Sequence, residues 1–172
     1  FLDKAQLNVR FRESYTDSLA GFLFQVNMGR MDLSELTAVT QPLANAKVSQ
    51  GFLDTLQLRA IGREYIAHGK MRMLYRDLKV EFLNKNDQQK KTIMTRFITW
   101  AANLIVKGKN TSRTGTVYTQ RIRERSVFNY WIKIVLSGAL TNAGIKSNTK
   151  QDKKYKKSVR KLNVPEIPEV TL

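Results

Sequence analysis

Apolar and polar residues alternate through most of the first half of this chain and again after residue 113. The segments with this alternation are 6–13, 22–30, 46–62, 64–84 and 114–124. Strict alternation gives a strand one apolar face and one polar face, which is typical of antiparallel sheets with one side in water. In the fourth segment the apolar positions change register after Tyr75, so we predict a bulge or break at Arg76–Asp77.

A helical period predicts three helices, over residues 32–43, 92–108 and 126–143. The first begins with Asp32 as an N-cap and has Glu35 three residues later, the arrangement of a capping box. The last is the most apolar and aromatic run of the chain. Its predicted apolar face carries Phe128, Trp131, Ile132, Val135, Leu136, Ala139, Leu140 and Ala143, and its predicted polar face carries Asn129, Lys133, Ser137 and Thr141.

Together the two periods predict an α+β fold, a predominantly antiparallel, curved β-sheet of the β-groove type with about three amphipathic helices. The chain of 172 residues is long enough for one domain with a real core, which we place at residues 1–147. It opens at Phe1 with a strand-like pattern, so we expect a fragment or a processed form of a larger protein. The sequence has no apolar run of about twenty residues, the length that spans a bilayer.

The chain is strongly basic, above all near its C-terminal end. The formal net charge is +16, which indicates a polyanionic partner such as nucleic acid, anionic lipid head groups or lipopolysaccharide. Eight basic residues and one acidic residue lie between Lys146 and Lys161, and two prolines follow at 165 and 168. We therefore predict a basic, proline-containing, flexible tail over residues 148–172, although a merely solubilising tail is the plain alternative. Its candidate anion-binding residues are Lys153, Lys154, Lys156, Lys157, Arg160 and Lys161.

Residues suited to catalysis are sparse. The chain has no cysteine, and His68 is its only histidine, so zinc–thiolate sites and histidine-rich metal sites are excluded. The acidic residues are scattered singly among basic ones, without the close pairs that general acid–base chemistry uses. We therefore expect no enzymatic activity, no cofactor and no bound metal.

Four short stretches carry a family resemblance. They are a Gly-x-Leu-Asp-x-Leu strand at residues 51–56, an Ala-x-Gly-x-Met-x-Met-x-Tyr-x-x-Leu strand at 67–78, an Ala-Asn-Leu helix at 102–104 and a Ser-x-Phe-Asn-Tyr-Trp helix at 126–131. Over about residues 20–145 the chain resembles the C-terminal portion of AsmA-like envelope proteins of the Bacteroidota type. These are packing and turn motifs without catalytic residues. The basic tail is not expected in this family.

The resemblance implies a periplasmic segment of a protein that an upstream part anchors in the inner membrane of a Gram-negative bacterium. Relatives, including TamB-like proteins, resemble bridge-type lipid-transfer proteins and take part in phospholipid movement to, and integrity of, the outer membrane. The implied function is non-enzymatic binding or transfer of phospholipid or another anionic lipid, or outer-membrane assembly, with envelope proteins as partners. Candidate groove-lining residues are Phe22, Phe24, Val26, Met28, Met71, Met73 and Tyr75, and the alternative is that they form a closed core under the helices.

The aromatic helix leaves two interpretations open. It can pack on the sheet as core, or it can lie at a membrane surface, which suits aromatic rings and a long lysine side chain. The membrane-surface candidates are Phe128, Tyr130, Trp131, Lys133 and Val135. Base stacking is less favoured, because one aromatic cluster has no basic groove beside it. The alternative function is a basic scaffold or a nucleic-acid-binding module that acts through the lysine-rich tail.

Overall fold

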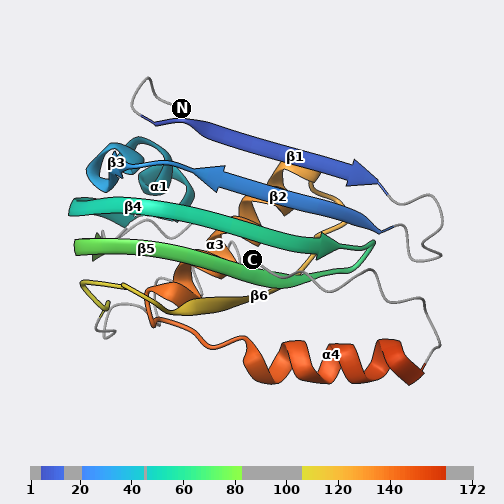
Figure 1. Ribbon diagram of the computed structural model, residues 1–172. Coiled ribbons are helices and arrows are strands. Elements are labelled where there is room, and N and C mark those ends of the chain that lie inside the picture. Colours follow the sequence, from blue (N-terminus) through green and yellow to red (C-terminus); the bar gives the residue numbers. More distant parts are fainter. Residues whose placement is uncertain (1–4, 14–20, 45, 83–105, 162–172) are drawn as a thin grey trace, which may run out of the picture.

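The structure, a computed structural model, describes residues 5–13, 21–44, 46–82 and 106–161. They form one curved, open antiparallel sheet with helices packed against it, which confirms the predicted α+β fold (Figure 1). All five predicted strands are present, whereas the helix predicted over residues 92–108 falls almost wholly outside the described residues. The elements are β1 (Leu7–Glu13), β2 (Phe22–Met28), β3 (Met31–Asp32), η1 (Leu33–Leu36), α1 (Thr37–Ala44), β4 (Ala46–Gly62), β5 (Ile66–Phe82), β6 (Thr114–Gln120), α3 (Val127–Asn142) and α4 (Thr149–Lys161).

The sheet has the order β1-β2-β4-β5-β6, with the short β3 paired to β4 as a sixth strand. Its centre is a long hairpin of β4 and β5, each of 17 residues, in which Leu58 lies opposite Met71. β1 and β6 form the two edges. Asp32 caps the first helical segment as predicted, because its carboxylate accepts a hydrogen bond from the Ser34 N–H at 2.8 Å.

The predicted irregularity in the long strand is confirmed. Phe52 pairs with Arg76, but Gln50 pairs with Lys79, so β5 carries one more residue than β4 in this interval. Asp77 takes the extra place with a φ of 54°, in the left-handed region that asparagine and aspartate tolerate better than most residues. The bulge returns Leu78 to the apolar side of the sheet, where it is buried.

The core lies between α3 and one side of the sheet, which we call the inner face. Along each strand every second side chain points to this face, which is why the alternation in the sequence matches the burial pattern. Glycines let the helix approach the strands closely. A Cβ atom at Gly138 would lie 2.8 Å from the Met71 Sδ atom, and one at Gly115 would lie 2.5 Å from the Asn142 Nδ2 atom. The opposite side of the sheet is the outer face.

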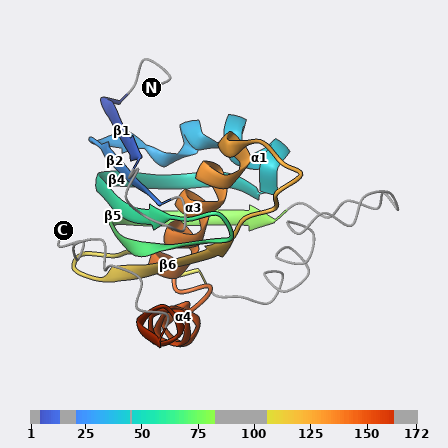
Figure 2. The ribbon, with the colours of Figure 1, turned by 90° about the vertical axis from the view of Figure 1, so that its right-hand side faces the viewer.

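The prediction of a flexible tail from residue 148 is wrong for residues 149–161, which form the helix α4 (Figure 2, where α4 is seen end-on beside β6). Asp152 and Val159 are buried, and the Tyr155 ring between them contacts His68 and Tyr118. The helix is amphipathic, but two of its three inward residues are polar or amphiphilic. A period based on apolar residues alone therefore misses it. Residues 162–172 lie outside the described residues.

Candidate functional site

Six of the seven candidate groove residues lie in the closed core. These six are buried on the inner face, where α3 covers them, and Met28 is partly buried at the margin of the same cluster. The Tyr75 hydroxyl donates to the Lys107 carbonyl at 2.7 Å and also lies 3.3 Å from the Asn142 carbonyl. Burial raises the pKa of Tyr75, so its hydroxyl stays protonated as a donor. The part of the inner face that carries Phe22, Phe24, Val26, Met71, Met73 and Tyr75 is therefore filled by protein.

The membrane-surface candidates on α3 divide between core and surface. Tyr130 is buried, and its hydroxyl donates to the Arg63 carbonyl at 3.0 Å. Trp131 and Val135 are partly buried, and the Lys133 ammonium donates to the Gln120 carbonyl. Phe128 is different, because 65% of its surface is exposed.

The helix also turns a different side to the sheet from the one predicted. Its buried residues are Tyr130, Ile134, Ser137, Gly138 and Asn142, and two of these are polar. Ser137 belongs to the face predicted to meet water, but it contacts the edge of β6 instead. The apolar stripe was misplaced because polar residues that bind a sheet edge cannot be told from solvated ones by hydropathy alone.

An apolar surface remains open where α3 passes β1. We call it the aromatic opening, and it consists of Val9, Phe11, Phe128, Trp131 and Ile132. Val9 and Phe11 are 48% and 40% exposed although they point to the inner face. Trp131 joins the two elements, since its ring centroid lies 5.3 Å from that of Phe11 and 5.2 Å from that of Phe128. The opening is thus continuous with the core.

The opening contains one polar group without a partner. The Nε1 atom of Trp131 is buried and has no hydrogen-bond acceptor within the part of the chain that the structure describes. The same ring stacks on Phe24 with centroids 5.4 Å apart, which fixes its orientation. Because this N–H is buried, the surface that the opening offers to a ligand is that of its exposed apolar side chains.

The outer face is basic. One row across the strands reads Arg10, Gln25, Arg59, Lys70 and Thr116, each opposite the next. The two neighbouring rows add Arg12 and Arg72, and none of the three rows contains an acidic residue. We call Arg10, Arg12, Arg59, Lys70 and Arg72 the basic face. Beside it lies a hollow of about 380 Å³, whose lining is Gln6, Asn8, Arg10, Asn27, Met28, Gly29, Thr55 and Gln57.

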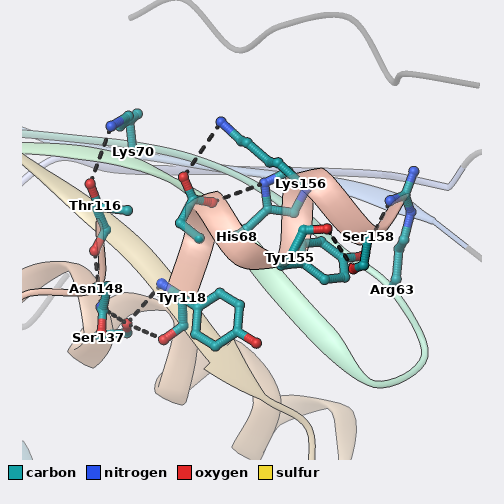
Figure 3. Close-up of polar contacts among 11 residues, drawn as sticks. Arg63, His68, Lys70, Thr116, Tyr118, Ser137, Asn148, Tyr155, Lys156 and Ser158 are labelled. Atoms are coloured by element: carbon teal, nitrogen blue, oxygen red, sulfur yellow. Dashed lines mark hydrogen bonds and ion pairs between the residues drawn. The ribbon is translucent and has the colours of Figure 1, made fainter. Parts of the chain in front are cut away.

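His68 and Asp152 join α4 to the sheet. Figure 3 shows His68, Tyr118 and Tyr155 gathered where α4 lies against β5 and β6. The His68 Nδ1 atom lies 3.6 Å from an Asp152 carboxylate oxygen, and the Lys156 ammonium lies 3.5 Å from the other. Burial, together with the cations of Lys156 and Arg63, lowers the pKa of His68 to about 4. At neutral pH this histidine is therefore uncharged.

The predicted tail residues project from α4. Five of the six are exposed, and Lys156 is half-buried beside Asp152. Within the described ranges no three His, Cys, Asp or Glu side chains gather as metal ligands. The contacts described in this region hold α4 against β5 and β6.

Comparison with protein-family models, with curated proteins and with solved structures found no match to this chain. None of the helices in the described part of the chain has the length and apolar character needed to cross a membrane.

Proposed function

We propose that this chain is a non-enzymatic lipid-binding segment of a cell-envelope protein, and that it holds the acyl part of a phospholipid or another anionic lipid against the aromatic opening. The observation that carries this proposal is the exposure of large apolar side chains in direct contact with the core. Exposed apolar patches that continue a core are typical of ligand or membrane contacts rather than of a solvated surface. The resemblance to AsmA-like proteins supports the same class of ligand and a periplasmic location.

The physical chemistry of the opening favours an acyl chain. Each methylene that leaves water gains about 0.8 kcal/mol, so a few methylenes against Phe11 and Phe128 give a useful affinity. The net charge of +16 would add a salt-dependent attraction for anionic head groups. We place the lipid at the exposed aromatic opening and not in the deep groove that the sequence predicts, because α3 fills that groove surface.

Lipids brominated on their acyl chains test the proposal, because bromine quenches tryptophan only at short range. The measurement uses Trp100→Phe protein, so that Trp131 is the only tryptophan, and vesicles of brominated phosphatidylcholine with or without phosphatidylglycerol. We expect quenching by both kinds of vesicle, with tighter binding to the anionic ones. Phe11→Ser combined with Phe128→Ser should weaken binding by about tenfold or more, since two large apolar contacts are lost.

Val39→Ser is the matched control, because Val39 is an exposed apolar residue on α1, outside the opening. It should bind lipid as the parent protein does. Unquenched fluorescence with vesicles in excess at low salt would overturn the lipid proposal.

The basic face favours a second candidate function, the binding of nucleic acid. Its three rows present five cations without an acid, and neighbouring strands about 4.8 Å apart would spread each row over about 19 Å, the scale of several phosphates. The aromatic side chains in these rows are His68 and Tyr118, and both contact Tyr155 of α4. The same protein preparations distinguish the two functions: duplex binding would survive Phe128→Ser but weaken in Arg72→Gln, with a shallower salt dependence.

A further inference from the structure

One edge of the sheet is covered by side chains. No described strand pairs with the outer side of β6. Instead, Ser137 accepts from the Tyr118 N–H at 3.1 Å and donates to the Tyr118 carbonyl at 2.9 Å. Thr141 and Asn148 both donate to the Thr116 carbonyl, at 2.9 and 3.0 Å. These four bonds occupy three of the backbone groups through which another strand would pair with β6. Proteins commonly block edges in this way to prevent unwanted pairing.

The other edge, β1, has no such cover among the described residues. No helix or strand in the described ranges pairs with its outer side, and β2 is its only strand neighbour there. Every described β1 residue after Leu7 is exposed. Side chains therefore hydrogen-bond to the outward backbone of β6, whereas the outward backbone of β1 has no such cover among the described residues.

Hydrogen bonds elsewhere in the sheet show which backbone N–H and carbonyl groups of β1 point away from β2. Asn142 binds the Met71 carbonyl and the Met73 N–H, so odd-numbered residues of β5 direct their backbone groups away from β4. Backbone groups alternate between the two sides of an antiparallel strand, and the register carries this phase through β4 and β2. The N–H and carbonyl groups of Val9 and Phe11 consequently point outward, whereas those of Arg10 bind β2.

The side chains of β1 set the kind of strand that fits beside it. Val9 and Phe11 offer exposed apolar surface on the inner face, and Arg10 and Arg12 offer cations on the outer face. Side chains directly opposite on neighbouring strands share a face and interact, and opposite charges in such pairs are stabilising. A strand with apolar residues next to Val9 and Phe11 and acidic residues next to the two arginines would satisfy all four positions.

We propose that the free edge of β1 is a docking site for an extended segment of a partner protein in which apolar and acidic residues alternate. The segment would add a seventh strand to the sheet by β-augmentation. A second copy of β1 fits less well, because antiparallel pairing centred on Arg10 places two guanidinium groups opposite each other. Strand addition uses the backbone of β1, which lipid binding does not, so the two can be separated by mutation.

A labelled seven-residue peptide of alternating valine and glutamate is the probe, and fluorescence anisotropy reports its binding. We expect it to bind at least about tenfold more tightly than the same peptide with lysine in place of glutamate. Val9→Pro should reduce binding by about tenfold or more, because proline removes an outward N–H while the ladder to β2 keeps its bonds. Val9→Ala, which keeps the N–H, is the matched control and should lose much less affinity.

Amide hydrogen exchange in the unmutated protein keeps the test valid if Val9→Pro fails to fold. Bound peptide should slow exchange at Val9 and Phe11 and leave Arg10 and Arg12 almost unchanged, since the latter amides already bind β2. Equal binding of the lysine peptide, or no slowing at Val9 and Phe11, would overturn the proposal. A dimer that forms without peptide and is lost in Val9→Pro would also overturn it, and would assign the edge to a second copy of the chain.

Discussion

Helices α3 and α4 both pack against β6, but different chemistry holds them there. α3 buries Tyr130 and Ile134 in the main core and closes on the strands through Gly138. α4 buries one apolar residue, Val159, and one acid, Asp152, and most of its other side chains are exposed. The first helix therefore gains its stability from apolar burial and buried amide bonds, whereas the second depends on a few polar contacts.

This difference predicts different responses to conditions. Apolar burial depends little on pH or salt, but the contacts of α4 include an uncharged histidine and an ion pair. Regions with few buried apolar contacts open at lower free energy than the core. We therefore expect α4 to detach from the sheet before α3 does.

The largest effect is expected from Asn142, the buried amide of α3. It donates to the Met71 carbonyl and accepts from the Met73 N–H, which lies just beyond Arg72, the last β5 residue that pairs with β6. Asn142→Leu keeps the size of the side chain but leaves both backbone groups buried without these partners. Each such loss costs about 1–3 kcal/mol, so the free energy of unfolding in urea should fall by about 3–5 kcal/mol.

Asn129→Leu is the control for this substitution, because Asn129 lies in the first turn of the same helix and is only partly buried. It should change the free energy of unfolding by no more than about 0.5 kcal/mol. If the two variants were equally stable, the contribution of the buried amide to α3 would be refuted.

Acidification should weaken the docking of α4 through His68. Its pKa is about 4 in the folded protein against an ordinary value of 6.5, so the unfolded chain binds more protons between these values. Stability is therefore complete above pH 6.5 and decreases as the pH falls toward 4. Since one pKa unit corresponds to 1.36 kcal/mol, we expect a loss of about 1–2 kcal/mol between pH 7 and pH 5.

Urea unfolding at a series of pH values measures this loss, and His68→Gln provides the comparison. The variant cannot take up the proton, so its stability should change much less across the same range. Parallel curves for the two proteins would show that His68 does not titrate differently on folding.

Much of the fold was predictable because the strands alternate so regularly. The inner positions of β2, β4 and β5 were read correctly from the period, and Asp77 marks the bulge that the change of register predicts. α3 was found as a helix, but its rotation was wrong. Ser137 and Asn142 bind backbone groups that only the folded sheet presents, and no local pattern in the sequence encodes the position of that edge.

The sites were predictable only in part. The apolar inner positions were identified, but their closure by α3 is a tertiary event, so the sequence could not separate groove from core. The helix α4 was not predicted because lysines dominate its sequence and few apolar residues show a helical period. Its inward residues Asp152, Tyr155 and Val159 nevertheless have helical spacing, which was a usable signal. The alternation predicted that the strand cations lie on the solvated face of a sheet. It did not predict that five of them gather without an acid, because they come from three strands and meet only through the register.

The smallest effect concerns two neighbouring lysines of α4. Lys156 pairs with Asp152 at 3.5 Å across one helical turn, and its charge helps to lower the pKa of His68. Lys157 is exposed and points elsewhere on the helix. Lys156→Gln should cost only about 0.3–0.5 kcal/mol of stability at pH 7, the usual value of such a pair, yet it should raise the pKa of His68 measured by NMR titration of the imidazole. Lys157→Gln should change neither quantity. An unmoved His68 titration in Lys156→Gln would mean that the ammonium group does not face the histidine, and that burial and the Arg63 cation keep it uncharged.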